Sequence, residues 1–179
     1  MVFSHEMLPT DPPSLWITRH APLIAAGGDV LDLACGSGRN ARWLAMQGFQ
    51  VTALDRDMSA LETIRHLPGI STLAADLENA PWPMPERRFD GIVVCRYLHR
   101  PLLPLIVQSL KPGGILLYET FMQGQEQIGR PRNPDFLLMP DELLHACAGL
   151  ETIAFEQGCF EEPVPAWTQR ICARNPSAR

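Results

Sequence analysis

The feature that most constrains the fold of this chain is a glycine turn between an apolar segment and an amphipathic one. The turn reads Ala34-Cys35-Gly36-Ser37-Gly38, it follows the largely apolar residues 30–33, and a helical pattern begins after it at Arg39. Glycine is needed in such a turn where the backbone takes a positive φ, or where a ligand approaches closer than a Cβ permits. The free N–H groups at the start of the helix then point toward that ligand. The segment therefore predicts a strand, a binding turn and a helix.

An acid at the end of the next apolar segment indicates what the ligand contains. Residues 51–54 form a short strand-like run, and Asp55 follows it, 17 residues after Gly38. An acid at the tip of the second strand of such a unit accepts hydrogen bonds from the two hydroxyls of a ribose. The two segments together predict a site for a nucleoside or nucleotide cofactor.

Asp32 distinguishes between two such cofactors. Gly36, Gly38 and Ala41 fit the dinucleotide pattern G-x-G-x-x-G/A, so the spacing of the glycines leaves NAD open. Asp32, however, stands four residues before Gly36. A carboxylate at that place repels a pyrophosphate but attracts an ammonium group.

With Asp32, both glycines and Asp55 at these spacings, the chain resembles the class I S-adenosylmethionine-dependent methyltransferases, whose first motif has the form D-x-x-x-G-x-G. Further matches are the segments 74–77, 89–95 and 110–118, so that the resemblance covers residues 14–174. The short chain and the segment Tyr118-Glu119-Thr120-Phe121 are also similar to small bacterial methyltransferases related to tellurite-resistance proteins.

Strand and helix patterns alternate along the chain, which predicts an α/β fold whose parallel sheet is covered on both faces. The resemblance implies a Rossmann-like three-layer sandwich with a seven-stranded, mostly parallel sheet in the order 3-2-1-4-5-7-6 and an antiparallel last strand. We expect a flexible N-terminal arm over residues 1–12 and a single methyltransferase domain over residues 13–179. Expected helices cover 13–26, 39–47, 58–66, 101–110 and 140–147, the last strands cover 150–157 and 166–173, and 80–85 and 122–133 are irregular.

The expected cofactor-binding residues lie at the carboxyl ends of the strands, where ligands bind in such sheets. Two of the acids have a purely structural alternative: Asp32 can cap a turn, and Asp76 can cap the segment that follows it. The resemblance implies S-adenosylmethionine as the cofactor, contacted by Asp32, Ala34, Gly36, Gly38, Asp55, Arg56, Asp76, Leu77 and Cys95.

The acceptor is expected between residues 96–100 and residues 119–121, under the irregular segment 122–133. His99 is the candidate general base, because its ordinary pKa suits proton removal near neutral pH; the alternative is a solvated loop histidine. The alternative role for Tyr97 is packing in the core. The alternative for the arginines of this region is that they are charged side chains in contact with solvent only. The residues predicted to contact the acceptor are Arg96, Tyr97, Glu119 and Arg130, with Arg132 on the same segment.

Composition excludes several other classes of function. A net charge of -5 argues against binding of nucleic acid by broad phosphate neutralisation. The five cysteines are an odd number without a C-x-x-C pair, which predicts buried, reduced thiols, no disulfide framework and no metal site. No apolar run approaches the ~18 residues that a membrane span requires, and residues 1–6 lack a secretory pattern, so we expect a cytoplasmic protein.

The function predicted from these residues and from the resemblance is methyl transfer from S-adenosylmethionine. A small-molecule acceptor is the first choice, because no recognition domain is appended. An RNA or protein acceptor comes second, and a nucleotide-binding module without catalysis comes third. A basic stripe on the rim of the pocket would favour an RNA acceptor. A closed pocket under residues 122–133 would favour a metabolite, and a pocket blocked by its own side chains would favour the non-catalytic module.

Overall fold

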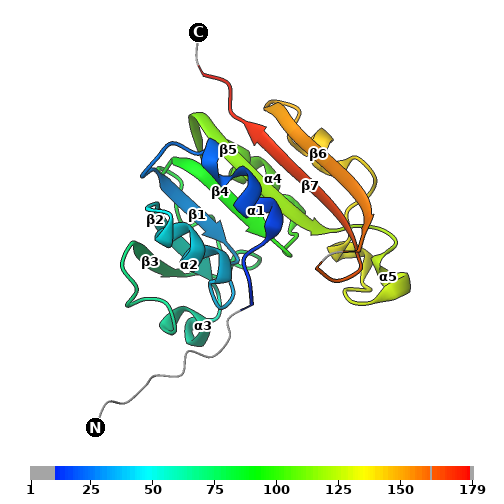
Figure 1. Cartoon of the computed structure of the whole chain (residues 1–179), viewed down its shortest axis with the longest axis horizontal. Helices are drawn as coiled ribbons and strands as arrows, with labels where there is room; N and C mark the ends of the chain where they lie inside the picture. Colours follow the sequence, from blue (N-terminus) through cyan, green and yellow to red (C-terminus); the bar gives the residue numbers. More distant parts are fainter. Residues whose placement is uncertain (1–10, 162, 178–179) are drawn as a thin grey trace.

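The computed structural model describes residues 11–161 and 163–177, which form one seven-stranded sheet. The strand order is β3-β2-β1-β4-β5-β7-β6. The neighbours from β3 to β5 pair in parallel, and β7 runs antiparallel to both β5 and β6, which confirms the predicted topology (Figure 1). The strands are β1 (Asp29–Leu33), β2 (Gln50–Asp55), β3 (Ile70–Ala74), β4 (Phe89–Cys95), β5 (Leu110–Phe121), β6 (Glu151–Phe160) and β7 (Ala166–Arg174).

Helices lie on both faces of the sheet, so the three-layer architecture is also confirmed. In Figure 1, α1 and α2 lie in front of the sheet and α4 lies behind it. The helices are α1 (Leu15–His20), α2 (Arg39–Met46), α3 (Met58–Glu62), α4 (Leu103–Gln108), α5 (Gln125–Ile128) and α6 (Glu142–Ala146), with short 3-10 turns η1 (Ala21–Leu23), η2 (Arg100–Leu102) and η3 (Pro134–Phe136).

The alternation of side chains along the strands explains why both faces are covered. In β1, Leu31 and Leu33 belong to the core on the side of α4 and α6, whereas Val30 belongs to the core under α1, α2 and α3. All three are fully buried. A strand that is apolar on both faces belongs in a parallel sheet between two helical layers, and each such side chain contributes about 1.5–3 kcal/mol by its burial.

Several helices are shorter than the sequence predicts. The helix expected over 13–26 covers Leu15–His20, because Pro22 has no N–H with which to continue it and a 3-10 turn follows. The helix expected over 58–66 ends at Glu62, and the N–H of Thr63 bonds to the carbonyl of Ala60 in a tighter turn. The segment 122–133, expected to be irregular, contains the short helix α5.

The sheet places the carboxyl ends of β1 to β5 at one edge. Strand order reverses between β1 and β4, which is where open α/β sheets bind their ligands. The predicted arm over residues 1–12 falls almost entirely outside the described residues and stays a prediction. Among the residues that the structure describes, no helix is long and apolar enough to cross a membrane.

Candidate functional site

Several hollows open along the carboxyl edge of the sheet, and three of them contain most of the predicted residues. We name them by their position, and Arg96, at the end of β4, lines all three. The β2 hollow is lined by Ala34, Asp55, Arg56, Ala75, Asp76, Leu77, Glu78, Arg96 and Tyr97. The α1 hollow includes Ser14, Arg39, Glu119, Phe121, Phe160, Val164 and Arg170, and the loop hollow is lined by Arg96, Phe121, Arg130, Pro131, Arg132, Asn133 and Phe136.

The two glycines of the turn serve different purposes. Both have a positive φ, +54° at Gly36 and +78° at Gly38. A Cβ added to Gly36 would meet nothing within 4 Å, so its free side is open to an approaching ligand. A Cβ at Gly38 would lie 2.6 Å from the Cδ1 of Ile64, so this glycine permits close packing of the turn against the segment after α3.

Asp32 lies beneath this turn and is almost completely buried. Its side chain is 1% exposed, and its Oδ2 atom has no hydrogen-bond partner among the described residues. Burial raises the pKa of this carboxyl to about 7, against the opposing effects of a backbone hydrogen bond from Ala41 and the charge of Arg39. Because Ala41 lies in the first turn of α2, this bond gives Asp32 part of the structural capping role that the sequence analysis left open. The remaining oxygen leaves the carboxylate half satisfied.

Asp55 lies at the end of β2 and faces the β2 hollow. Its Oδ2 accepts a hydrogen bond from the N–H of Gly36 at 2.7 Å, and its Oδ1 accepts one from the N–H of Asp57 at 2.9 Å. These bonds fix the carboxylate, and each oxygen keeps a second lone pair for another donor. The glycine turn and the strand-tip acid are therefore one hydrogen-bonded unit.

Asp76 follows β3 and has the structural role that was its alternative. Its Oδ1 accepts from the N–H groups of Glu78 and Asn79 at 3.0 and 3.2 Å, and its Oδ2 accepts from the Asn79 side chain at 2.9 Å. The bond from the Asn79 side chain is the main cause of the lowered pKa of this carboxyl. Asp76 nonetheless lines the β2 hollow together with Leu77, so the cap also orients it there.

The strand exits on either side of the reversal hold strained residues. Ala34 after β1 and Arg96 after β4 have φ values of 55° and 56°, although neither is glycine. Non-glycine residues in this left-handed conformation cost about 1–3 kcal/mol each and concentrate at functional sites. Both residues line the β2 hollow.

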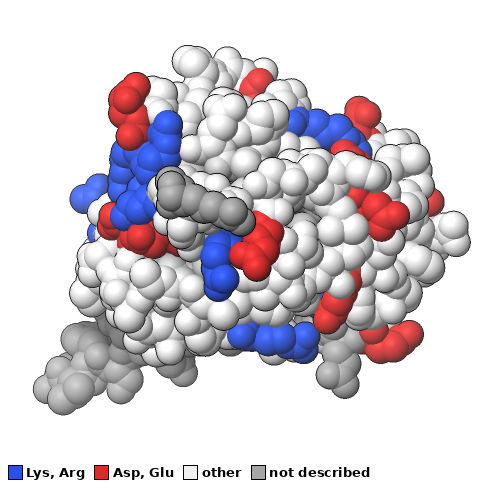
Figure 2. Space-filling view, turned by 90° about the horizontal axis from the view of Figure 1, so that it is seen from above, with Lys and Arg blue, Asp and Glu red and all other residues white. Residues whose placement is uncertain are grey.

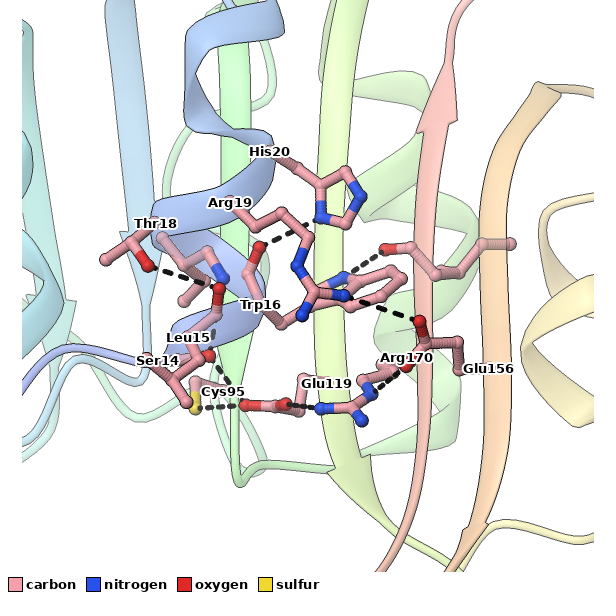
Figure 3. Close-up of polar contacts among 12 residues, drawn as sticks. Ser14, Leu15, Trp16, Thr18, Arg19, His20, Cys95, Glu119, Glu156 and Arg170 are labelled. Carbon is pink, nitrogen blue, oxygen red and sulfur yellow. Dashed lines mark hydrogen bonds and ion pairs between the residues drawn. The ribbon is translucent and has the colours of Figure 1, made fainter. Parts of the chain in front are cut away.

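Glu119, in β5, is the centre of a network below the α1 hollow (Figure 3). Its Oε1 accepts a hydrogen bond from the Ser14 hydroxyl at 2.7 Å and one from the Cys95 thiol at 3.6 Å. Its Oε2 lies 3.5 Å from the Arg170 guanidinium. Arg39 in turn donates to the sulfur of Cys95 at 3.1 Å. Burial raises the pKa of the Cys95 thiol to about 12, so that it is protonated at neutral pH.

Arg170, in β7, holds this network in place. Its side chain is 14% exposed and also pairs with Glu156 at 2.9 Å. The guanidinium stacks over Phe160, 3.7 Å from the ring centroid, a geometry that combines charge with packing. Glu119 is thus oriented from three different parts of the chain.

Tyr97 and His99, the residues predicted after β4, lie in different surroundings. Tyr97 lines the β2 hollow, its hydroxyl is buried without a partner among the described residues, and burial raises its pKa to about 12. His99 is half-buried before η2 and lines none of the three hollows. This position gives its predicted role as a base no support.

The structure brings most of the predicted residues to this edge and adds others that the sequence analysis missed. Of the residues predicted to contact the acceptor, Glu119 lines the α1 hollow and Arg130 the loop hollow, and their contact with an acceptor stays a prediction. Sequence reasoning missed Ser14, Arg39 and Arg170, because each contributes through a partner at least 51 positions away. The only local signal was the serine before the first helix, which is typical of an N-cap.

The described cysteines form no disulfide, and the possible ligands form no metal site. All five cysteines are free; Cys95, Cys147 and Cys172 are buried, but Cys35 is only partly buried and Cys159 is exposed, which corrects the expectation that all are buried. Cys159 lies in β6, at the end of the sheet order. Among the described residues, no three histidine, cysteine or acidic side chains gather as metal ligands.

Comparison with known proteins agrees with a cofactor site at this edge of the sheet. Residues 30–114 match the family described as a methyltransferase domain. The chain is 34% identical over 110 residues to trans-aconitate 2-methyltransferase of Methylobacterium nodulans, covering 58% of this chain and 42% of that protein. It is 31% identical over 90 residues to the probable S-adenosylmethionine-dependent methyltransferase TehB of Haemophilus influenzae, covering 46% and 30%.

The fold is shared well beyond the matched residues. The solved structure of TehB from Haemophilus influenzae superposes with a TM-score of 0.75 at 21% identity, covering 89% of this chain and 61% of that one. The chain spans less than half the length of the curated relatives named above. Over residues 30–114 the chain thus matches a methyltransferase domain, and in its strand order it is similar to the class I S-adenosylmethionine-dependent methyltransferases.

Proposed function

We propose that this chain transfers a methyl group from S-adenosylmethionine to a small organic acceptor. The observation that carries the proposal is the buried, half-satisfied carboxylate of Asp32 under the glycine turn. A buried acid needs a donor for its free oxygen, and the ammonium of an amino-acid group supplies both a donor and a compensating charge. A pyrophosphate at the same place would add a second negative charge.

The residues around the turn fit this cofactor. Asp55, fixed by Gly36 and Asp57, is proposed to accept the ribose hydroxyls, and Asp76 and Leu77 to hold the adenine. Asp32 and Gly36, with Cys95, are proposed to hold the amino-acid end of the cofactor. When bound, S-adenosylmethionine supplies a methyl group on a sulfonium, which is already a good leaving group.

What remains for the chain's own residues is alignment and the exclusion of side reactions. Positioning alone contributes up to ~7–11 kcal/mol to such a reaction. The Cys95 thiol, protonated because of its raised pKa and engaged by Arg39 and Glu119, is protected from being methylated itself. A base is needed only where the acceptor arrives protonated.

The acceptor is proposed to bind between the exits of β4 and β5, under the segment that follows β5. The hollow there is open. It is thus not the closed pocket under residues 122–133 that would favour a metabolite by its shape alone. The relatives that support a small acceptor include trans-aconitate 2-methyltransferase and demethylmenaquinone methyltransferase.

An RNA acceptor is less well supported by the distribution of charge. On the face shown in Figure 2, blue Lys and Arg side chains lie beside red Asp and Glu side chains and form no continuous stripe among the described residues. The whole chain carries a net charge of -5. Broad neutralisation of phosphates requires a basic surface.

The proposal is tested by calorimetry with two cofactors. We expect saturable binding of S-adenosylhomocysteine and none of NAD at the same concentration. Saturable binding of NAD with no binding of S-adenosylhomocysteine would refute the cofactor. A screen for S-adenosylhomocysteine release across thiols, metalloid oxyanions, phenols, amines, carboxylates and total RNA then identifies the acceptor class; release with RNA alone contradicts a small acceptor.

A further inference from the structure

We propose that the acceptor is an organic carboxylate whose acid group is bound by Arg130 and Arg132 and whose apolar body lies against Phe121 and Phe136. The inference rests on the proposed methyl transfer and specifies the substrate class of its acceptor site. It follows from the charge of the loop hollow, from how its loop is anchored, and from the position of one acid beside it.

The loop hollow has an excess of positive charge. Arg96, Arg130 and Arg132 all line it, and no Asp or Glu does among the described residues. None of these three guanidinium groups lies within 4.0 Å of a described carboxylate, whereas Arg100 and Arg170 are each paired. An arginine fork matches the two oxygens of a carboxylate and holds it by charge-assisted hydrogen bonds.

Buried hydrogen bonds hold the arginine-bearing loop in shape. Gln125 in α5 is 5% exposed; its Nε2 donates to the carbonyl of Arg130 at 3.0 Å, and its Oε1 accepts from the N–H of Trp167 at 2.9 Å. A Cβ at Gly124 would lie 2.6 Å from the Trp167 ring, so the loop packs directly on β7. The backbone of the loop is therefore held in place before the acceptor binds, which lowers the entropic cost of binding.

The other end of the loop is anchored as firmly. Arg100 donates to the carbonyls of Asp135 and Leu137 at 2.8 and 2.9 Å, while an ion pair with Glu142 holds its guanidinium. Arg100 thus has a structural function, unlike the three arginines that face the hollow.

The walls of the hollow indicate an organic body rather than a bare oxyanion. Phe121 and Phe136 both line it, and Phe136 is 46% exposed. An exposed aromatic ring beside a cationic site offers contact area to an apolar or planar group.

The position of Glu78 sets the direction in which the acceptor binds. A passage lined by Glu78, Arg96, Tyr97, Phe121, Pro131 and Phe136 lies between the β2 hollow and the loop hollow. Glu78 repels an acid group at the cofactor end of this passage. The carboxylate is therefore directed toward Arg130 and Arg132, and the atom that receives the methyl group faces the cofactor.

The test measures binding to full-length protein saturated with S-adenosylhomocysteine. Benzoate and 2-naphthoate are compared with benzamide and 2-naphthamide by ligand-observed NMR, and selenite is the inorganic control. We expect the carboxylates to bind about tenfold or more tightly than the matching amides, because charged hydrogen bonds are lost in the amides. The double variant Arg130→Gln/Arg132→Gln should abolish this preference, and Arg174→Gln, near the opposite edge of the sheet, should retain it.

Three results would overturn the inference. These are equal binding of acids and amides, a preference that survives in the double variant, or selenite binding with no binding of the aromatic acids. Absence of measurable binding by any of these probes counts against it as well. Each of these results leaves the proposed methyl transfer intact if S-adenosylhomocysteine still binds, so the two proposals fail separately.

Discussion

The β2 hollow and the α1 hollow share one edge of the sheet but are built in different ways. In the β2 hollow, partners no more than 19 positions away orient the acids: Gly36 and Asp57 donate to Asp55, and Glu78 and Asn79 donate to Asp76. In the α1 hollow, Glu119 is oriented by Ser14, 105 positions away, and by Arg170, 51 positions away. The bonds that orient the acids of the β2 hollow therefore come from nearby turns. The bonds that orient Glu119 in the α1 hollow form only when distant parts of the chain have come together on the sheet.

This difference agrees with where the match to the family model ends. The family match stops at residue 114, before the Glu119, Arg130 and Arg170 positions that line the α1 and loop hollows. A cofactor common to many enzymes can be bound by a conserved local design, but each acceptor requires its own long-range arrangement. Substitutions on the two sides should therefore differ in what they damage.

The largest effect is expected from Asp32, whose pKa of about 7 lies far above its ordinary value of 3.8. Between these two pH values the folded protein holds a proton that the unfolded chain has lost. The stability of the ligand-free protein should thus fall as the pH rises from about 4 to about 7, by up to about 4 kcal/mol. The lowered pKa values of Asp76, Asp90 and Glu142 change stability only below about pH 4.5 and in the opposite direction, so most of this window is free of their effect.

Urea denaturation across this pH range measures the effect. Asp32→Asn cannot titrate, so its stability should change less with pH than that of the wild type. Parallel curves for the two proteins would show that the carboxyl is already ionised at low pH. The affinity of the wild type for S-adenosylhomocysteine should increase toward pH 7, since an ionised Asp32 is the form that attracts its ammonium.

The next effect tests the long-range side. Arg170→Met removes the cation between Glu119 and Glu156, leaving the 15% exposed Glu119 side chain without its partner. Breaking such a pair costs about 3–5 kcal/mol, and the more exposed Glu156 puts this case at about 3 kcal/mol. Arg174→Met is the matched control in the same strand, because its 39% exposed side chain pairs with Glu151 at 3.8 Å and should cost about 0–1 kcal/mol. Equal losses of stability in the two variants would contradict the role of Arg170.

The third effect tests the local side and should change binding rather than folding. Asp55→Ala loses charged hydrogen bonds worth about 1.5–3 kcal/mol, which weakens S-adenosylhomocysteine binding roughly ten- to a hundredfold or slightly more. Glu62→Ala, which removes an exposed ion pair with Arg65 in the same region, is the control. Calorimetry should find its affinity unchanged. Wild-type affinity in Asp55→Ala would remove this residue from the site.

How far the sequence predicts the molecule follows the same division. Spacing alone located Asp32, Gly36 and Asp55, because the strand, turn and helix that position them are continuous in the chain. It also identified Glu119 as a candidate, but not the partners that orient it, because nothing local links Ser14 or Arg170 to β5. The hydrogen bonds by which Gln125 holds the loop could not be predicted from the sequence either, since they depend on β7 packing against the loop.

The smallest effect is expected at His99, the candidate base. Histidine is the most frequent general base in enzymes, and such a base contributes about a hundredfold or more to turnover. However, His99 is half-buried and lines none of the three hollows, whereas Arg96 and Tyr97 just before it do. We therefore expect His99→Ala to retain turnover within about threefold, since a general base must come within hydrogen-bond reach of its proton. A hundredfold loss of turnover with unchanged cofactor affinity would establish His99 as the base.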